Sequence, residues 1–266
     1  MSTTTEGFAK VDTSARGIPI TRLVGVEIRK MFDTRSGFWL MASIGIIALL
    51  ATIGVIAFVP EENLSYAIFG TAFGVPMNIL LPVVAILAVT SEWSQRTGLV
   101  TFTLTPNRGS VVLSKFLAVI LAGVGAMLVV LAVGALGNLV GSAIRGISPD
   151  WNLTLEDFLL LLLGNVLSML IGFMLGVLIR NSAAAIVGYF VYSFVVPTIF
   201  GVLSALPATR DWFGDIQPWI DVNSAIGNLF DAPTAKDWAH LAVSSIPWFF
   251  LPMGFGLWRV LKSEVK

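Results

Sequence analysis

Six long apolar stretches without a single charged residue limit what this chain can fold into. Each approaches or exceeds the roughly 20 residues that an α-helix needs to cross the hydrocarbon core of a bilayer. Only 12% of the 266 residues are charged and 56% are hydrophobic, and a water-soluble domain could not bury that much apolar surface. The sequence therefore predicts an all-α integral membrane protein. The charge-free stretches are Ser36–Pro60, Asn63–Ser91, Phe116–Ile144, Phe158–Ile179, Asn181–Thr209 and Leu241–Trp258.

The spans expected from these stretches sit in one membrane domain. The first residues, 1–18, are polar and lack the apolar core of a signal peptide, so we expect them to be disordered. Residues 19–266 then form a single six-span domain. The predicted spans cover residues 37–60, 65–90, 111–141, 157–179, 182–206 and 239–260.

The distribution of Lys and Arg predicts the orientation of the chain. An even number of spans places both termini on one side of the membrane. If that side is the cytoplasm, 13 of the 16 Lys and Arg residues lie inside and the other three lie outside. The positive-inside rule therefore favours a multi-pass membrane protein with both termini cytoplasmic.

The spans offer little for covalent or ion-coupled chemistry. The charge-free stretches contain none of the ionisable groups that usually carry a coupling ion. The chain has no Cys and one His, His240, which we expect at the outer membrane interface, so no catalytic group, resident metal or cofactor is predicted in this chain. Candidates to line a translocation path are the aromatic and amide residues within the spans, namely Phe73, Asn78, Asn165, Tyr189 and Tyr192.

Glycines recur in three small-xxx-small patterns, which allow close approach of helices in a membrane. They are Gly70–Gly74, Gly137–Gly141 and Gly172–Gly176. Packing within the chain is the favoured interpretation, ahead of a dimer contact.

Residues 20–36 form a basic amphipathic pattern before the first span. Leu23, Val24, Ile28, Met31 and Phe32 recur at helical spacing, which predicts a helix on the membrane surface. The alternative is a helical extension of the first span. The charged residues of this predicted connecting helix are Arg22, Glu27, Arg29, Lys30 and Arg35.

The loop between the second and third spans, residues 90–115, combines charge, aromatic residues and turn signals. Glu92 and Arg96 have the i,i+4 spacing of a helical ion pair. Alternatively, the two side chains could reach charged groups of another protein across an interface. The segment Thr105–Gly109 predicts a turn, Ser110 could cap a helix that begins at Val111, and Lys115 would lie near the membrane surface. We therefore expect a short cytoplasmic helix that could receive mechanical work from a soluble partner.

At these residues the chain resembles the permease subunits of type-two ABC exporters, in their bacterial half-size form. The matching residues are Glu92, Arg96, Thr97, Leu104, Pro106, Arg108 and Lys115. The opening segment Leu23–Trp39 is similar to the connecting helix of that family, and Gln217–Gly227 is similar to its outer loop before the last span. The resemblance implies a coupling helix after the second span and a re-entrant outer segment between Asp211 and Asp237.

The resemblance also implies the partners. The chain has no G-x-x-x-x-G-K-[ST] phosphate loop, so ATP and Mg²⁺ would be held by two separate ABC ATPase subunits. A second permease subunit, identical or homologous, would complete the path within the lipid bilayer of the bacterial cytoplasmic membrane, and no nucleic acid is involved. The function that the resemblance implies is export of an amphipathic substrate such as a drug, antibiotic peptide, lipid or glycolipid. Contact with the ATPase would fall to Glu92, Trp93, Arg96, Thr97 and Arg108.

Three other functions stay open. A sodium-efflux permease of the ABC type could coordinate Na⁺ with amide, hydroxyl and carbonyl oxygens. A membrane assembly factor or sensor would need no ATPase at all. An ion- or proton-coupled carrier is disfavoured by the uncharged spans.

Overall fold

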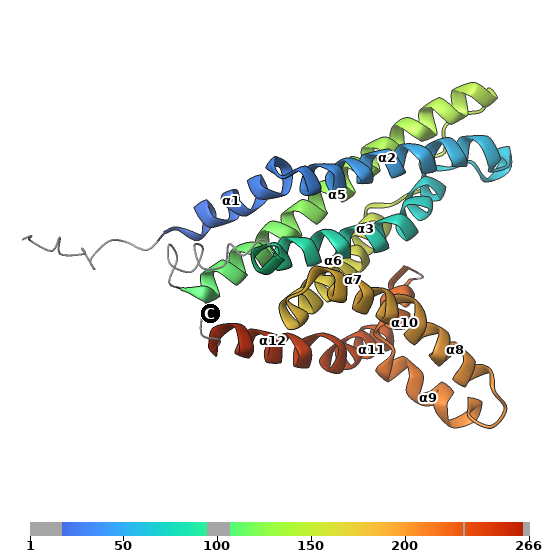
Figure 1. The fold of residues 1–266 in the computed structure, drawn as a ribbon. Coiled ribbons are helices and arrows are strands. Elements are labelled where there is room, and N and C mark those ends of the chain that lie inside the picture. Colours follow the sequence, from blue (N-terminus) through green and yellow to red (C-terminus); the bar gives the residue numbers. More distant parts are fainter. Residues whose placement is uncertain (1–17, 95–106, 231, 263–266) are drawn as a thin grey trace, which may run out of the picture.

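The computed structural model describes residues 18–94, 107–230 and 232–262. Every regular element in those residues is helical, and six helical segments are long and apolar enough to cross a membrane (Figure 1). The all-α, multi-pass prediction is thereby confirmed, and no predicted end differs from the observed one by more than four residues. The first four spans are α2 (Arg35–Phe58), α3 (Tyr66–Ser94), α5 (Arg108–Arg145) and α6 (Leu155–Ile179).

The fifth and sixth spans are each interrupted by a π-helical turn. Pro197 follows one of these turns closely, and Pro247 lies within the other. Proline has no N–H to donate, and local π geometry is one way for a helix to absorb that loss. The fifth span comprises α7 (Ser182–Phe190), η2 (Val191–Val195) and α8 (Val196–Ala205), and the sixth comprises α11 (Ala235–Ser245), η4 (Ile246–Phe250) and α12 (Leu251–Lys262).

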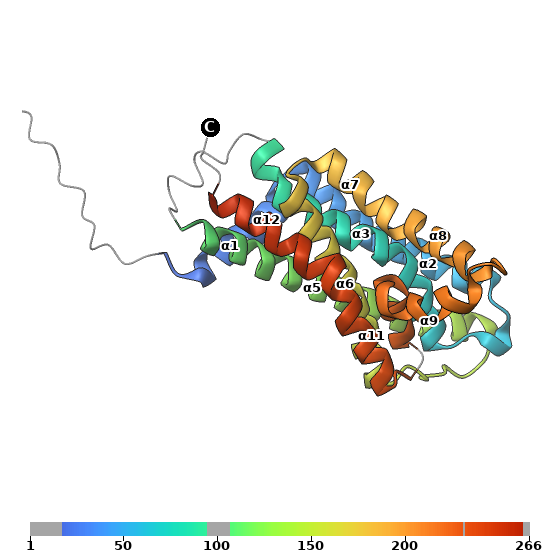
Figure 2. The same ribbon diagram turned by 90° about the horizontal axis from the view of Figure 1, so that it is seen from below.

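Helices α3 and α6 form the centre of the bundle. Helices α2 and α5 pack on one flank of α3, while α7 and α12 pack against α6 on the other (Figures 1 and 2). The buried apolar side chains form two clusters that follow this division. The start of α5 and the end of α12 lie at the same end of the molecule as α1 (Ile20–Asp33).

Helix α1 is separate from the first span. Thr34 has an extended backbone, and its Oγ1 accepts a hydrogen bond from the Gly37 N–H at the start of α2. The break excludes the alternative of a continuous extension. The helix packs on α5 and α2 through Val24, Glu27 and Met31, so its buried face includes a carboxylate.

The other charged side chains of α1 and its junction with α2 lie on the surface. The exposed ones are Arg22, Arg29, Lys30, Asp33 and Arg35, and the basic residues among them follow the amphipathic pattern. Phe32 was predicted on the apolar face but is 51% exposed. It lies one residue beyond Met31 and so points away from α5.

The ends of several helices are capped by side chains. Helix α5 begins at Arg108, and Asn107 caps it through Oδ1, which accepts from the Ser110 N–H at 3.2 Å. The prediction that Ser110 is the cap is therefore wrong, because the helix starts earlier than expected. The opposite end of α5 stops at Gly146, whose φ of 68° favours glycine.

The segment between the fifth and sixth spans is helical and folds back on the bundle. Helix α9 (Arg210–Ile220) packs against α8 and α11, and α10 (Val222–Gly227) packs against α11. The indole N–H of Trp248, in the sixth span, donates to the Ile220 carbonyl at 2.7 Å. His240 is buried, because α9 covers it and its ring lies edge-on to Trp219, 4.5 Å between ring centres.

Candidate functional site

Four charged side chains meet where α1, α3 and α5 converge. The ammonium of Lys115 lies 2.6 Å from Oε2 of Glu27 and 3.2 Å from Oε1 of Glu92. It also donates to the Ala88 carbonyl at 3.2 Å. Lys30 lies 2.7 Å from Glu27 and 3.7 Å from Glu92. We call Glu27, Lys30, Glu92 and Lys115 the ion-pair junction.

The junction is buried and balanced in charge. The side chains of Lys115, Glu92 and Glu27 are only 3%, 4% and 9% exposed, whereas Lys30 is 45% exposed. Burial by itself raises the pKa of Glu27, but the charges and hydrogen bonds of Lys115 and Lys30 outweigh it and hold the pKa below its usual value. Glu27 is therefore ionised at neutral pH, and the junction ties three helices together by charge.

The structure places the carboxylate of Glu92 among basic side chains of other helices. It points inward to Lys115 and Lys30, and the side chain is 4% exposed. Arg96 and Thr97 lie outside the described residues, as does most of the predicted coupling helix. Lys115, which we expect near the membrane surface, lies near the start of α5 and is buried because α1 and α3 close over it.

The junction could have been found from one sequence signal. Glu27 is three residues after Val24 and four before Met31, which places a carboxylate within the apolar stripe of α1. A charge in that position needs a partner of opposite sign. The sequence does not say which basic residue supplies it, because the partner is 88 positions away in the chain.

Two further contacts join helix ends near the junction. Nη1 of Arg108 donates to the Val260 carbonyl at 3.2 Å, which links the start of α5 to the end of α12. The guanidinium of Arg180 lies over the ring of Trp93, 5.8 Å from its centre, which links the end of α6 to α3. Arg108 and Trp93, two of the residues predicted to contact the ATPase, therefore make contacts within the chain.

The five candidate path residues do not gather in one place. The Tyr189 hydroxyl donates to the backbone carbonyl of Asn78 at 2.5 Å, and the Tyr189 and Tyr192 rings lie 6.1 Å apart. Phe73 belongs to the other apolar cluster. Nδ2 of Asn165 donates to a carbonyl of its own helix. The structure thus groups three of the five.

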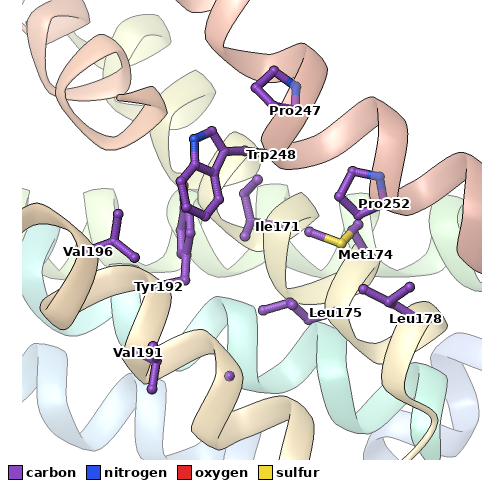
Figure 3. Close-up of a pocket in the computed structure, with 11 residues that line it drawn as sticks. Ile171, Met174, Leu175, Leu178, Val191, Tyr192, Val196, Pro247, Trp248 and Pro252 are labelled. Atoms are coloured by element: carbon purple, nitrogen blue, oxygen red, sulfur yellow. The ribbon is translucent and has the colours of Figure 1, made fainter. Parts of the chain in front are cut away.

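A cavity of about 310 Å³ lies between the fourth, fifth and sixth spans. The Tyr192 and Trp248 rings form one wall, 5.4 Å between their centres, and α6 forms another (Figure 3). The Tyr192 hydroxyl is buried and has no hydrogen-bond partner in the described part of the chain. The lining is otherwise apolar and comprises Ile171, Met174, Leu175, Leu178, Gly188, Val191, Val196, Pro247 and Pro252 together with the two rings.

These features suit binding and movement within a membrane. Within residues 18–94, 107–230 and 232–262, no group of three or more His, Asp or Glu side chains is placed to hold a metal ion. The junction instead offers a fixed electrostatic connection between a surface helix and two spans, and the cavity offers apolar space at membrane depth. Comparison with the models of known protein families and with curated proteins finds no match to this chain.

Proposed function

We propose that this chain is the permease subunit of an ATP-driven exporter that moves an amphipathic substrate out of the cytoplasm or the inner leaflet. ATP and Mg²⁺ are held by two separate ATPase subunits, and a second permease completes the path. The observation that carries the proposal is the ion-pair junction, which joins a surface helix to two membrane spans.

The junction supplies a route for mechanical work. Helix α1 presents Arg22 and Arg29 on its exposed face, where a soluble subunit can push or pull. Lys115 bonds both to Glu27 on α1 and to Glu92 on α3. Separating these charges in a site of low dielectric costs several kcal/mol. A displacement of α1 is therefore passed to α3 and α5 together instead of being lost in side-chain motion.

The composition of the spans indicates that transport depends on energy supplied from outside the membrane. The apolar cores of the spans hold no Asp, Glu, Lys or Arg that could carry a coupling ion through the membrane. An energy source outside the bilayer is then required for net transport. The small-residue contacts and π-helical turns of the spans provide helices that can shift against one another.

The first test is co-purification of the chain with an ATPase encoded beside its gene. We expect the wild-type chain to bring down the ATPase, and the double variant R22E/R29E to bring down at least about tenfold less, because it reverses the charge of the exposed face of α1. Arg210→Glu, an exposed change at the opposite end of the molecule, is the matched control and should bind as wild type.

Coupling is tested separately from assembly. Glu92→Gln keeps the shape of the side chain but removes its charge from the junction. We expect the ATPase to stay bound while transport per ATP hydrolysed falls. Capture of no ATPase by the wild-type chain would sink the proposal and favour an assembly factor or sensor. ATP hydrolysis stimulated by Na⁺ alone would identify sodium as the cargo.

A further inference from the structure

Two arginines at the junction end of the molecule have no carboxylate partner among the described residues. Arg180 ends α6 in a left-handed conformation, with φ of 58°. Its Nε and Nη2 atoms are buried and make no hydrogen bond in the part of the chain that the structure describes. Arg259, on α12, stacks over Phe255 and makes no ion pair in that same part of the chain. The nearby carboxylates of Glu27 and Glu92 are already paired with lysines.

The two arginines lie close enough to repel each other. Burial, and then the positive charge of Arg259, lower the pKa of the Arg180 guanidinium from its usual value. Arg180 nevertheless stays protonated at neutral pH, because an arginine pKa starts far above it. Buried N–H donors and two like charges leave a place that an anion would stabilise, above all a phosphate, which accepts several hydrogen bonds at once.

The apolar cavity lies near this place, farther along α6 and α12 toward the middle of the spans, and neither arginine lines it. Leu178, which lines it, is two residues before Arg180 on α6. Pro252, which also lines it, is seven residues before Arg259, so both occupy the same face of α12, about 10 Å apart. Gly256, one turn after Pro252, packs against Val177 and Leu178. An acyl chain that joins the arginines to the cavity must therefore pass beside this α6–α12 contact.

The cavity reaches about as deep into the spans as one leaflet of a bilayer. The far end of the cavity is formed by Tyr192 and Trp248, near the middle of the fifth and sixth spans (Figure 3). Half of a hydrocarbon core is roughly 15 Å, which is the depth that a lipid chain reaches from its own headgroup region. Val191 is 46% exposed and lines the cavity, so lipid chains around the bundle can enter from the side.

We propose that this chain binds a phospholipid from the leaflet on the side of its termini, with the phosphate between Arg180 and Arg259 and one acyl chain in the cavity. The charge of the headgroup is complementary to the two guanidinium groups, and the chain fits an almost wholly apolar lining. The inference does not rest on the proposed coupling role, because it needs neither an ATPase nor the ion-pair junction.

The test is retention of lipid by the purified chain, counted by native mass spectrometry in detergent. The three probes are dioleoyl phosphatidylglycerol, glycerol 3-phosphate and dioleoylglycerol, which separate headgroup from chains. We expect only the complete phospholipid to stay bound. Arg180→Gln and Arg259→Gln should each weaken its binding about tenfold or more, because each removes charge-assisted hydrogen bonds. Arg210→Gln, at the opposite end, should bind as wild type.

A second pair of variants tests the cavity. Val196→Trp fills it, whereas Val195→Trp adds the same bulk on an exposed neighbour that does not line it. We expect only Val196→Trp to lose the lipid. Arg259 is exposed, so Arg259→Gln keeps the test usable if Arg180→Gln does not fold.

Three outcomes would overturn the assignment. Equal lipid retention by wild type, Arg259→Gln and Val196→Trp would remove the site. Equally tight binding of glycerol 3-phosphate would make it a site for free phosphate esters. A change in oligomeric state with Val196→Trp, without loss of lipid, would make this face a contact between two copies of the chain.

Discussion

Individual charged residues hold the membrane edge of this protein together. Lys115 is buried near the start of α5, yet the hydropathy of that span stays high because the residue lies before its apolar core. Hydropathy along the sequence locates the apolar core of a span, but it does not show which charged side chains pair with one another next to that core. The residues of the junction could be predicted individually as charged positions, but their pairing depends on how α1 packs across α3 and α5.

Removing the ammonium of Lys115 should strongly destabilise the fold. In Lys115→Met, the carboxylates of Glu27 and Glu92 stay buried without a full partner, and breaking a buried pair costs about 3–5 kcal/mol. Lys30→Met is the control, because that side chain is 45% exposed and its pairs are worth about 1 kcal/mol or less. Thermal unfolding in detergent measures both.

A compensating variant separates lost charge balance from lost packing. The triple variant E27Q/E92Q/K115M removes all three buried charges of the junction. It should therefore regain much of the stability that Lys115→Met loses. A triple variant as unstable as Lys115→Met alone would show that the loss came from packing and not from charge.

The junction should make the protein sensitive to acid. The pKa of Glu27 lies below its usual value of 4.5 in the fold, so its ion pairs contribute their full stability above that pH. The contribution is lost as the pH falls through the lowered value. We expect the unfolding temperature of wild type to fall below about pH 4.5, and Glu27→Gln to show less of this pH dependence. Identical pH profiles for the two proteins would contradict it.

At the scale of helices, close contacts between small residues set the central packing. A Cβ at Gly172 would lie 2.6 Å from the Pro82 carbonyl oxygen, and one at Gly137 would lie 2.8 Å from the Phe69 ring. These contacts are within the chain, as the interpretation of the small-xxx-small patterns expects. Gly74 faces open space, so the patterns by themselves do not tell which glycine matters.

Gly172→Ala should therefore separate α6 from α3. The added methyl group meets the backbone of α3 and not a flexible side chain, and overpacking of this kind costs about 1–3 kcal/mol. Gly74→Ala, with nothing within 4 Å of the new methyl group, should be neutral or slightly stabilising. The measurement is the difference in unfolding temperature between the two variants, and equal values would refute a tight α3–α6 contact.

The spans could be predicted within a few residues because hydropathy along a helix is a local property. The π-helical turns of the fifth and sixth spans could not, since a proline signals a distortion without fixing its geometry. The burial of His240 and the bond from Trp248 to Ile220 depend on where α9 folds back, which no local pattern encodes. The cavity has the same origin, because its walls come from three separate spans.

At the scale of the whole molecule, one end carries most of the chemistry. One end of the molecule holds α1, the start of α5 and the end of α12 (Figure 1). The ion-pair junction, the hydrogen bond from Arg108 to α12 and the two arginines of the proposed lipid site all lie at this end. The excess of basic residues at this end predicts that it faces the cytoplasm. The export proposal requires that orientation for access to an ATPase, whereas for the lipid site the orientation decides only which leaflet supplies the lipid.

Single-cysteine labelling tests the orientation directly, because the chain contains no cysteine of its own. Ser148→Cys lies in an exposed connection between the third and fourth spans, and Ala183→Cys lies at the exposed start of the fifth. A maleimide that cannot cross membranes should label Ser148→Cys in intact cells and Ala183→Cys only after the cells are permeabilised. The reverse pattern would place both termini outside, out of reach of ATP and of a cytoplasmic ATPase, and would leave the lipid site in the outer leaflet.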